Sequence, residues 1–549
     1  MRTGSPSVAG SHRHPQQGGG RIRVLLQRRR RFPPLLLVAA ALAVAIVAAL
    51  PLVYLVVRAT ERPDALFDLL WRDRTFLLLR HSLTLMVTVT FGSLLLAVPI
   101  AWLTTRTDLP GRRIWWVASS LPLVVPSYVG GFAIIATLGP RGSVQGWLEP
   151  LGVQRLPEIY GWFGAWLTLT LFTFPYVLLP VRAALASLDS SLEDAARSLG
   201  MSAWATFWRV TLPQLRPAAA AGSLLVAFYV LSDFGAVSLM RYDTFTMGIY
   251  NQYRSAFDRT LAAGLSLVLV SLTLVVLLLE AWTRKRTRYH RSSVGAAHPP
   301  RKVALGRWRW VAAVWCAVVV SCSLLIPVGV VTFWVLHSVR ERDPLSQVLE
   351  VGLRTAGVSL TAALVAVLAA APVVVLSVRF PGWLASLIER LTWAGYALPG
   401  IVIALTLVFF GLRVAPRLYQ TLAMLILAYV IRFLPQAVGA LRAPMLQLNP
   451  HLEDTARSLG YRTPRIWERV MLPLLTPGVF SAATLVFLTC MKELPATMLL
   501  RPTGFETLAT RIWSASSEGF WAQAAVPSLV LIIVSAIPLL AVALREELP

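Results

Sequence analysis

The chain has 549 residues, of which 56% are hydrophobic and 14% are charged. This composition excludes an ordinary soluble protein and is typical of a polytopic membrane protein. The formal net charge of +25 does not predict a nucleic-acid partner, because the basic residues lie in short segments between long apolar runs, as in the cytoplasmic loops of membrane proteins. Residues 1–34 and 284–309, for example, contain several arginines and no acidic residue.

About twelve apolar runs are long enough to cross a bilayer as helices. They are preceded by residues 1–34, which are rich in Gly, Ser and Arg and are predicted to form a disordered, basic cytoplasmic N-terminus. A basic cytoplasmic linker at 284–307 divides the runs into a first transmembrane domain, 35–283, and a second, 308–549. The expected spans are 35–57, 82–105, 114–138, 161–186, 215–240 and 260–283, then 308–336, 355–378, 391–412, 419–441, 475–500 and 524–544.

The charges of the loops predict the orientation of the chain in the membrane. With a cytoplasmic N-terminus, the connection that follows each even-numbered span faces the cytoplasm, and these are the arginine-rich connections in both domains. The opposite loops, such as 58–80 and 337–354, mix acidic and basic residues. We therefore expect both termini of this multi-pass protein to lie in the cytoplasm.

One charged sequence occurs twice in this apolar chain. The octapeptide Glu-Asp-Ala-Ala-Arg-Ser-Leu-Gly at 193–200 returns 260 residues later, at 453–460, with threonine in place of the first alanine. Packing against lipid does not explain a repeated polar sequence, so the repeat indicates two copies of one functional element. Shorter resemblances accompany it: Asp233-Phe-Gly-Ala with Glu493-Leu-Pro-Ala, Ser82-Leu-Thr with Ser359-Leu-Thr, and Leu121-Pro with Leu398-Pro.

The repeat also predicts the fold class. Six expected spans separate the two copies, and because six is an even number, the two domains have the same orientation in the membrane. A parallel repeat of this kind implies a pseudo-two-fold axis along the membrane normal, with any pathway between the halves. We expect an all-α polytopic membrane protein built from two parallel six-helix repeats.

Each copy lies between the fourth and fifth span of its domain, on the predicted cytoplasmic face. The acidic pair that begins each copy is favoured in the first turn of a helix, and the glycine that ends it readily takes the left-handed conformation that stops a helix. An amphipathic helix that only caps the bundle is one interpretation. Two near-identical copies at equivalent positions favour the other, a docking site for a soluble partner.

The pattern Glu-(Asp)-Ala-Ala-x3-Gly, followed about a dozen residues later by Leu-Pro, resembles the "EAA" loop of ATP-binding-cassette importer permeases. In that family the loop forms the coupling helix that docks on an ATPase subunit. A single chain with two such loops is similar to the fused iron(III) permeases and the related thiamine permeases. The residues that match are Glu193, Asp194, Ala195, Ala196 and Gly200 in the first copy, and Glu453, Asp454, Thr455, Ala456 and Gly460 in the second.

The resemblance implies a type I importer permease-like fold in the bacterial inner membrane. It also implies two copies of a separate ATPase subunit and an extracytoplasmic substrate-binding protein as partners. The chain has three lysines and none follows the Walker A pattern, so we expect no enzyme activity and no cofactor, with ATP bound by the partner subunits. Iron(III) is the expected substrate. Thiamine or another small solute is the alternative, and an ion-gradient-driven secondary transporter is an alternative of a different class.

Ionisable residues inside membrane spans are costly and are therefore candidates for the translocation pathway. These candidates are Asp233, Arg432, Lys492 and Glu493. Lys492 and Glu493 are neighbours that would offset each other's charge, and Arg432 would otherwise extend towards the membrane surface or pair with a carbonyl in the bundle. Carboxylates and phenols suit iron(III), and Asp233, Glu493, Tyr229 and Tyr242 are candidates for transient ligands, but no set of residues predicts a firm metal site.

Overall fold

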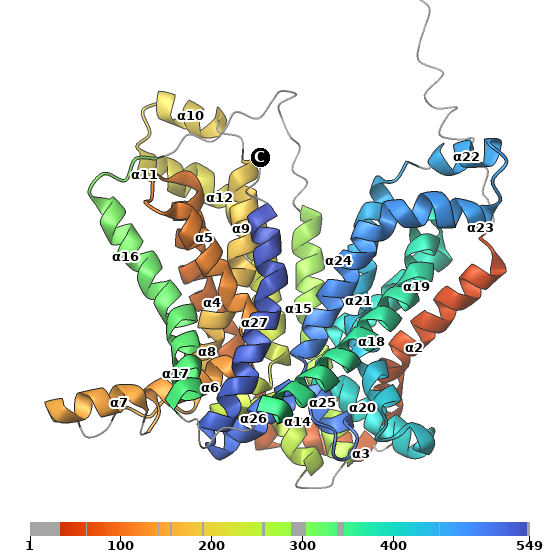
Figure 1. Cartoon of the computed structure of the whole chain (residues 1–549), viewed down its shortest axis with the longest axis horizontal. Coiled ribbons are helices and arrows are strands. Elements are labelled where there is room, and N and C mark those ends of the chain that lie inside the picture. Colours follow the sequence, from red (N-terminus) through yellow and green to blue (C-terminus); the bar gives the residue numbers. More distant parts are fainter. Residues whose placement is uncertain are drawn as a thin grey trace, which may run out of the picture.

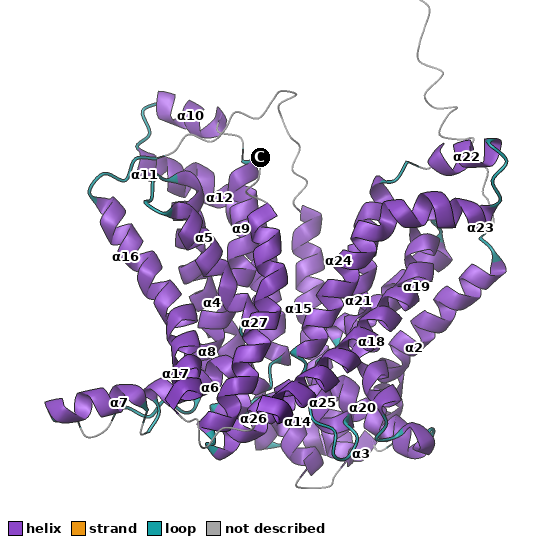
Figure 2. Ribbon diagram, in the orientation of Figure 1, coloured by secondary structure: helices purple, strands orange, loops and turns teal. Residues whose placement is uncertain are grey.

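The computed structural model describes residues 33–61, 63–140, 142–153, 156–188, 191–254, 259–286, 303–337, 345–449 and 451–545. Within these ranges the chain is helical and has no strand beyond an isolated bridge between Thr107 and Val303 (Figure 2). The predicted disordered N-terminus up to residue 32 and residues 287–302 of the predicted linker lie outside the described residues.

The first half of the chain runs from α2 to α15. Its helices are α2 (Leu35–Thr60), α3 (Pro63–Leu70), α4 (Asp73–Arg106), α5 (Arg112–Ser120), η1 (Leu121–Val124), α6 (Ser127–Leu138), α7 (Ser143–Leu148), η2 (Glu149–Leu151), α8 (Trp162–Thr173), α9 (Pro175–Ser187), α10 (Ser191–Ser198), α11 (Ala203–Thr206), η3 (Phe207–Thr211), α12 (Leu212–Ser232), α13 (Gly235–Leu239), α14 (Phe245–Arg254) and α15 (Arg259–Arg286).

The second half repeats this order from α16 to α27. Its helices are α16 (Trp308–Val320), η4 (Ser321–Leu325), α17 (Ile326–His337), α18 (Leu345–Arg379), α19 (Trp383–Ala397), α20 (Gly400–Arg413), η5 (Pro416–Leu418), α21 (Leu422–Gln447), α22 (His451–Ser458), α23 (Thr463–Ile466), η6 (Trp467–Met471), α24 (Leu472–Met491), α25 (Pro495–Leu500), α26 (Leu508–Glu518) and α27 (Trp521–Arg545).

The membrane spans agree with the prediction from the sequence. In the described part of the chain, nine helices are long and apolar enough to cross a membrane, and two pairs bent by 102° and 103° raise the number to eleven if each pair is one span. A shorter apolar helix, Trp521–Ile537, coincides with the last predicted span. The fifth span of each half ends earlier than predicted, at Ser232 and Met491, and a short helix follows.

Two of the shorter sequence resemblances, those of Ser82 with Ser359 and of Leu121 with Leu398, differ by one helical turn from the equivalence that the structure shows. Ser82 Oγ accepts a hydrogen bond from the Phe245 backbone N–H at 3.0 Å, and Thr355 Oγ1 accepts the equivalent bond from Leu508 at 2.9 Å. Ser82 therefore corresponds to Thr355 and not to Ser359. By the same register, the proline that precedes α6 is Pro126, which corresponds to Pro399 before α20, so the match of Leu121-Pro122 with Leu398-Pro399 was wrong.

The first span of each half packs on the other half. Helix α2 lies against α18, α19 and α20, and α16 lies against α5 and α4 (Figure 1). Tyr54 in α2 donates a hydrogen bond to the Phe409 carbonyl at 3.3 Å. Between the halves, Trp513 Nε1 also donates to Ser238 Oγ at 2.9 Å. The two repeats therefore share one interleaved core.

The two copies of the octapeptide lie at one end of the bundle. Figure 1 shows α10 and α22 at the top of the view, one over each half and well apart, whereas α14, α25 and α26 lie together at the opposite end. Small residues allow close packing in the second half: Ala362, Ala366 and Ala370 are fully buried on α18, which packs against α21 and α24.

Because each first span packs on the other half, we predict that the halves stay together without a covalent link. Two chains divided within residues 287–302 and co-expressed should co-purify in mild detergent when only one carries an affinity tag. The same experiment without α2 should lower the yield of the untagged half. Recovery of the tagged half alone from the divided chain would contradict the interleaved packing.

Candidate functional site

The two octapeptide copies have the same local structure. Each forms a two-turn helix, α10 or α22, with two acids in its first turn. Gly200 and Gly460 both take φ = 85°, a conformation that costs little only for glycine. The residue after each glycine closes the end of the helix: Met201 N–H donates to the Ala196 carbonyl, and Tyr461 N–H donates to the Ala456 carbonyl, both at 3.1 Å.

The first glutamate of each copy faces an arginine at the end of the second span. Glu193 Oε2 lies 3.6 Å from Arg106 Nη1, and the Arg106 side chain is 2% exposed. Glu453 Oε1 lies 3.0 Å from Arg379 Nε. Glu193 also accepts a hydrogen bond from Thr211 Oγ1 at 2.8 Å. These glutamates therefore hold α10 and α22 against the membrane-spanning helices.

Neither arginine partner is among the residues predicted from the sequence, although their positions carry a signal. Arg106 and Arg379 are the last residues of α4 and α18, and each lies seven residues after a proline inside its helix, Pro99 or Pro372. A basic residue at the same place in two repeats is the pattern that identifies a partner for a repeated acid. The positive-inside pattern alone explains an arginine there without requiring such a partner.

The outer faces of α10 and α22 also match residue by residue. Ala196 and Ala456 are buried, whereas Asp194, Ala195, Asp454 and Thr455 are exposed. Leucines stand out from this small polar surface: Leu192 is 54% and Leu199 85% exposed, and Leu452 and Leu459 are 41% and 72% exposed. Leu192 and Leu452 lie on the helices, and Leu199 and Leu459 directly follow them, so the two loops present exposed leucines at equivalent positions.

A second group of polar residues lies where the fifth spans end. Asp233 is 7% exposed and Glu493 is 5% exposed. Asp233 Oδ1 accepts the Ala236 backbone N–H at 2.9 Å, and Glu493 Oε1 accepts the Ala496 N–H at 3.1 Å. Each acid therefore caps the short helix that follows it, α13 or α25, and the two are equivalent in the repeat.

The structure pairs the predicted pathway residues differently from the prediction. Arg432 does not extend towards the membrane surface; its Nη1 lies 2.9 Å from Glu493 Oε1. Lys492 does not pair with its neighbour Glu493, because its Nζ donates to the Leu123 carbonyl of the other half at 3.3 Å. Asp233 instead accepts a hydrogen bond from Ser127 Oγ.

The two tyrosines suggested as ligands, Tyr229 and Tyr242, make different contacts. Tyr242 stacks on His81, with ring centroids 4.7 Å apart, and its hydroxyl faces the His81 carbonyl at 3.5 Å. Tyr229 packs against Tyr176 on α9, with centroids 5.6 Å apart. Since Tyr229 lies in the last turn of α12, four residues before Asp233, it stays close to that buried acid, whereas Tyr242 packs on His81.

A glycine makes room for the Arg432–Glu493 pair. A Cβ atom on Gly400 would lie 1.3 Å from Arg432 Nη1 and 2.6 Å from Glu493 Oε1. Gly400 begins α20 directly after the break at Pro399. The first half has Ser127 at this place, and its hydroxyl bonds Asp233.

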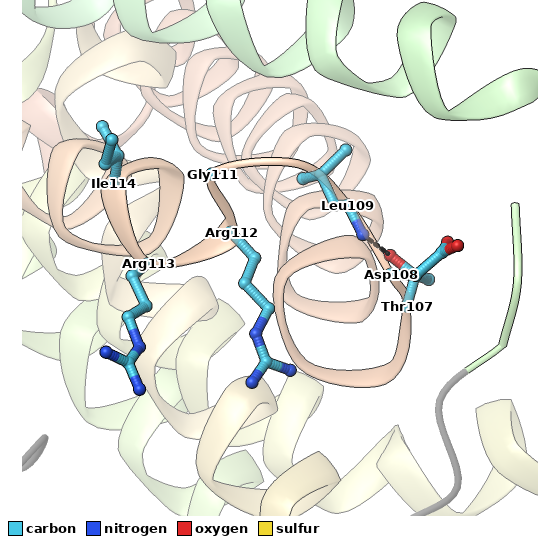
Figure 3. Close-up of a pocket in the computed structure, with 7 residues that line it drawn as sticks. All are labelled: Thr107, Asp108, Leu109, Gly111, Arg112, Arg113 and Ile114. Atoms are coloured by element: carbon cyan, nitrogen blue, oxygen red, sulfur yellow. Dashed lines mark hydrogen bonds between the residues drawn. The ribbon is translucent and has the colours of Figure 1, made fainter.

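A pocket lies on the loop between α4 and α5 (Figure 3). Its walls include Arg112 and Arg113, whose side chains extend to the same side of the loop, and Ile114. Residues that follow the linker pack beside it: Val303 N–H donates to the Arg106 carbonyl at 2.8 Å, and Leu305 N–H donates to Asp108 Oδ1 at 2.8 Å. The linker thus rejoins the fold next to the arginine that faces Glu193.

The duplicated helical fold and its two equivalent loops define a membrane transport permease. Residues 89–289 and 362–545 each match the family described as "binding-protein-dependent transport system inner membrane component". The chain belongs to this family and is a multi-pass permease of an ATP-binding-cassette importer. Its partners are therefore an ATPase and a substrate-binding protein.

Individual relatives match either the whole chain or one half of it. The "Fe(3+)-transport system permease protein FbpB 2" of Haemophilus influenzae is 35% identical over 495 residues, which are 89% of this chain and 94% of that protein. The "Molybdenum transport system permease protein ModB" of the same organism is 34% identical over 37% of this chain and 91% of its own length. The "probable sulfate transport system permease protein cysT" of Chlorokybus atmophyticus is 29% identical over 42% of this chain and 81% of its own length.

Glu193→Gln and Glu453→Gln each remove the charge that faces an arginine while keeping the side chain's size. We expect ATP hydrolysis stimulated by the binding protein to fall by about 5- to 150-fold, the range for a coupling energy of about 1–3 kcal/mol. The reconstituted complex with its ATPase gives this rate directly. Glu350→Gln, which breaks the exposed pair with Arg354, is the control and should change little. Unchanged stimulation in both loop variants would contradict the anchoring role.

Gly400→Ala should displace Arg432 and leave the buried Glu493 without its partner. We expect a loss of about 3–5 kcal/mol, the usual cost of breaking a buried ion pair, seen as a lower melting temperature in detergent. Gly400→Ala combined with Arg432→Met and Glu493→Gln should recover most of the loss, because no buried charge remains. A melting temperature unchanged by Gly400→Ala would show that stability does not require the close approach of Arg432 to Gly400.

Proposed function

We propose that this permease carries iron(III) across the inner membrane. The observation that supports the cargo is the similarity to the iron(III) permease FbpB 2, which extends over 89% of the chain and both halves. The molybdenum and sulfate permeases match only 37% and 42% of the chain. Thiamine or another small solute is the remaining alternative from the sequence, and no observation on the fold favours it.

We propose that two copies of the ATPase bind, one on each loop. The surface for each copy consists of the exposed face of α10 or α22, and the two faces share the same exposed positions. The first glutamate and the glycine of each loop shape this surface, and the exposed leucines would fill apolar hollows on the ATPase. The residues assigned to coupling are Glu193, Asp194, Ala195, Ala196, Gly200, Glu453, Asp454, Thr455, Ala456 and Gly460.

This assignment gives the orientation of the chain. The end that carries α10 and α22 faces the cytoplasm, both termini lie on that side, and the binding protein delivers its cargo at the end that carries α14 and α26. The chain itself binds no ATP and no cofactor, and catalysis belongs to the ATPase. The domain boundaries expected from the sequence, at 35–283 and 308–549, stay part of this proposal.

In the mechanism we propose, closure of the two ATPases draws α10 and α22 together. The Glu193–Arg106 and Glu453–Arg379 pairs transmit this movement to α4 and α18, because each arginine ends its span. The halves then separate at the opposite end, where Lys492 holds the Leu123 carbonyl of the other half. Asp233, Arg432, Lys492 and Glu493 lie along the pathway that this movement opens.

Uptake into proteoliposomes tests the cargo and the energy source together. With the ATPase, an iron-loaded binding protein and ATP, we expect radiolabelled iron(III) to accumulate, and excess unlabelled thiamine should not compete. An uncoupler that removes ion gradients should leave uptake unchanged. Uptake that persists without ATP, or that thiamine abolishes, would contradict the proposal.

A further inference from the structure

One contact between the halves joins two equivalent residues of the repeat. Phe245 and Leu508, the first residues of α14 and α26, donate equivalent backbone hydrogen bonds to the second spans. Tyr250 and Trp513 each lie five residues further along these helices, so they are equivalent too. Their rings meet edge to face, with centroids 6.2 Å apart. A residue that touches its own equivalent lies on the two-fold axis, as in a symmetric dimer.

The two rings belong to a fixed apolar cluster. Phe234, at the break after α12, packs on both of them, with its centroid 4.9 Å from that of Tyr250 and 5.9 Å from that of Trp513. Phe234 is 1% exposed and Tyr250 is 7% exposed. Trp513 Nε1 donates a hydrogen bond to Ser238 Oγ at 2.9 Å. Arg254 Nη1 donates one to the Tyr250 hydroxyl, also at 2.9 Å. These bonds hold both rings in their orientation across the axis.

The cluster lies at the end of the bundle where the halves meet. Figure 1 shows α14 and α26 together at this end, whereas α10 and α22 stand well apart at the other. Because a pathway between two parallel repeats runs along their axis, an apolar cluster on the axis closes it at this end. Apolar rings at a constriction exclude hydrated ions, since an ion would lose water there without gaining a polar partner.

The cluster is joined to the end of the fifth span. Phe234 directly follows Asp233, one of the candidate pathway residues. The Asp233 carbonyl accepts a hydrogen bond from Thr246 Oγ1 on α14 at 2.6 Å. Tyr250 lies one turn further along the same helix, so its ring moves with the first half. Trp513 lies on α26 and moves with the second half. Separation of the halves at this end therefore parts the two rings.

We propose that Tyr250 and Trp513, supported by Phe234, form the extracytoplasmic gate of the permease. The rings are in contact in this structure, so the gate is closed. When the halves separate at this end, the rings part and the pathway opens towards the binding protein. The inference rests on the orientation and the movement proposed above but not on the cargo, because the gate depends only on the repeat and on its apolar rings.

Cross-linking tests whether the rings must part. Tyr250→Cys and Trp513→Cys are combined in a full chain whose three native cysteines are replaced by alanine, reconstituted with the ATPase and the iron-loaded binding protein. Dibromobimane, which becomes fluorescent when it joins two nearby thiols, links the pair. Phe67→Cys with Trp71→Cys is the matched control, because these ring centroids are also 6.2 Å apart but both residues belong to the first half.

We expect the linked Tyr250→Cys/Trp513→Cys chain to lose iron(III) uptake to the level measured without ATP. The linked control should keep the rate that it has before linking. Uptake by the linked gate variant at its unlinked rate would overturn the proposal, since the rings would then stay together throughout transport. Unmodified vesicles that import no iron would contradict the proposed cargo, and the gate is then decided by its seal against ions.

Passive ion flux tests this seal without ATP, the binding protein or iron. The purified chain is placed in potassium-loaded vesicles, and the efflux of potassium is measured. We expect Tyr250→Ala and Trp513→Ala each to raise the flux by about fivefold, the change in open population that the loss of an aromatic pair of about 1 kcal/mol gives. Tyr250→Phe, which keeps the ring, and the control Phe67→Ala should stay close to the unmodified flux. A flux unchanged in both gate alanine variants would overturn the gate.

Discussion

The ion pair between each loop glutamate and the arginine that ends the second span is the contact on which the rest of the structure depends. A soluble motor moves a membrane protein only through elements rigidly joined to its spans. Glu193 meets Arg106, which is almost fully buried, and Glu453 meets Arg379. Because unpaired charges are costly in such surroundings, the pairs keep α10 and α22 attached while leaving their leucines exposed to a partner.

Much of this arrangement could be predicted from the sequence, and there are physical reasons why the rest could not be predicted. Apolar length predicts spans well, because lipid requires it: nine of the twelve predicted segments coincide with long apolar helices, two with bent helix pairs and the last with a shorter apolar helix. The repeat predicted two equivalent loops. The partner of Lys492 could not be predicted: a neighbouring acid is close in sequence, but the lysine's contact is the Leu123 carbonyl of the other half, 369 residues away. The predicted equivalence of Ser82 with Ser359 was also wrong, because Thr355 accepts the equivalent backbone hydrogen bond with a different side chain.

The halves share a fold but differ in the chemistry of their interior. At the outer faces of α10 and α22, exposure matches position by position, and this match supports the proposal that each loop binds one copy of the same ATPase. The surroundings of the two buried acids differ. Gly400 leaves space for Arg432 to approach Glu493, whereas Ser127, at the equivalent position, donates a hydrogen bond to Asp233. Fusion of two repeats into one chain allows this divergence, because each half can change without changing the other. The two loops therefore stay alike where the proposed coupling requires it, whereas the buried residues of the two halves differ.

The role of the ion pair in linking loop to span is tested most directly by a charge-exchange cycle at the second loop, using Arg379→Glu, Glu453→Arg and the double variant. Stimulated ATP hydrolysis and uptake are measured for each in the reconstituted complex. If the pair transmits movement, each single variant loses most of its activity and the double variant regains a large part, a coupling of about 1–3 kcal/mol. Losses that simply add in the double variant would contradict the claim that this contact links the loop to the spans.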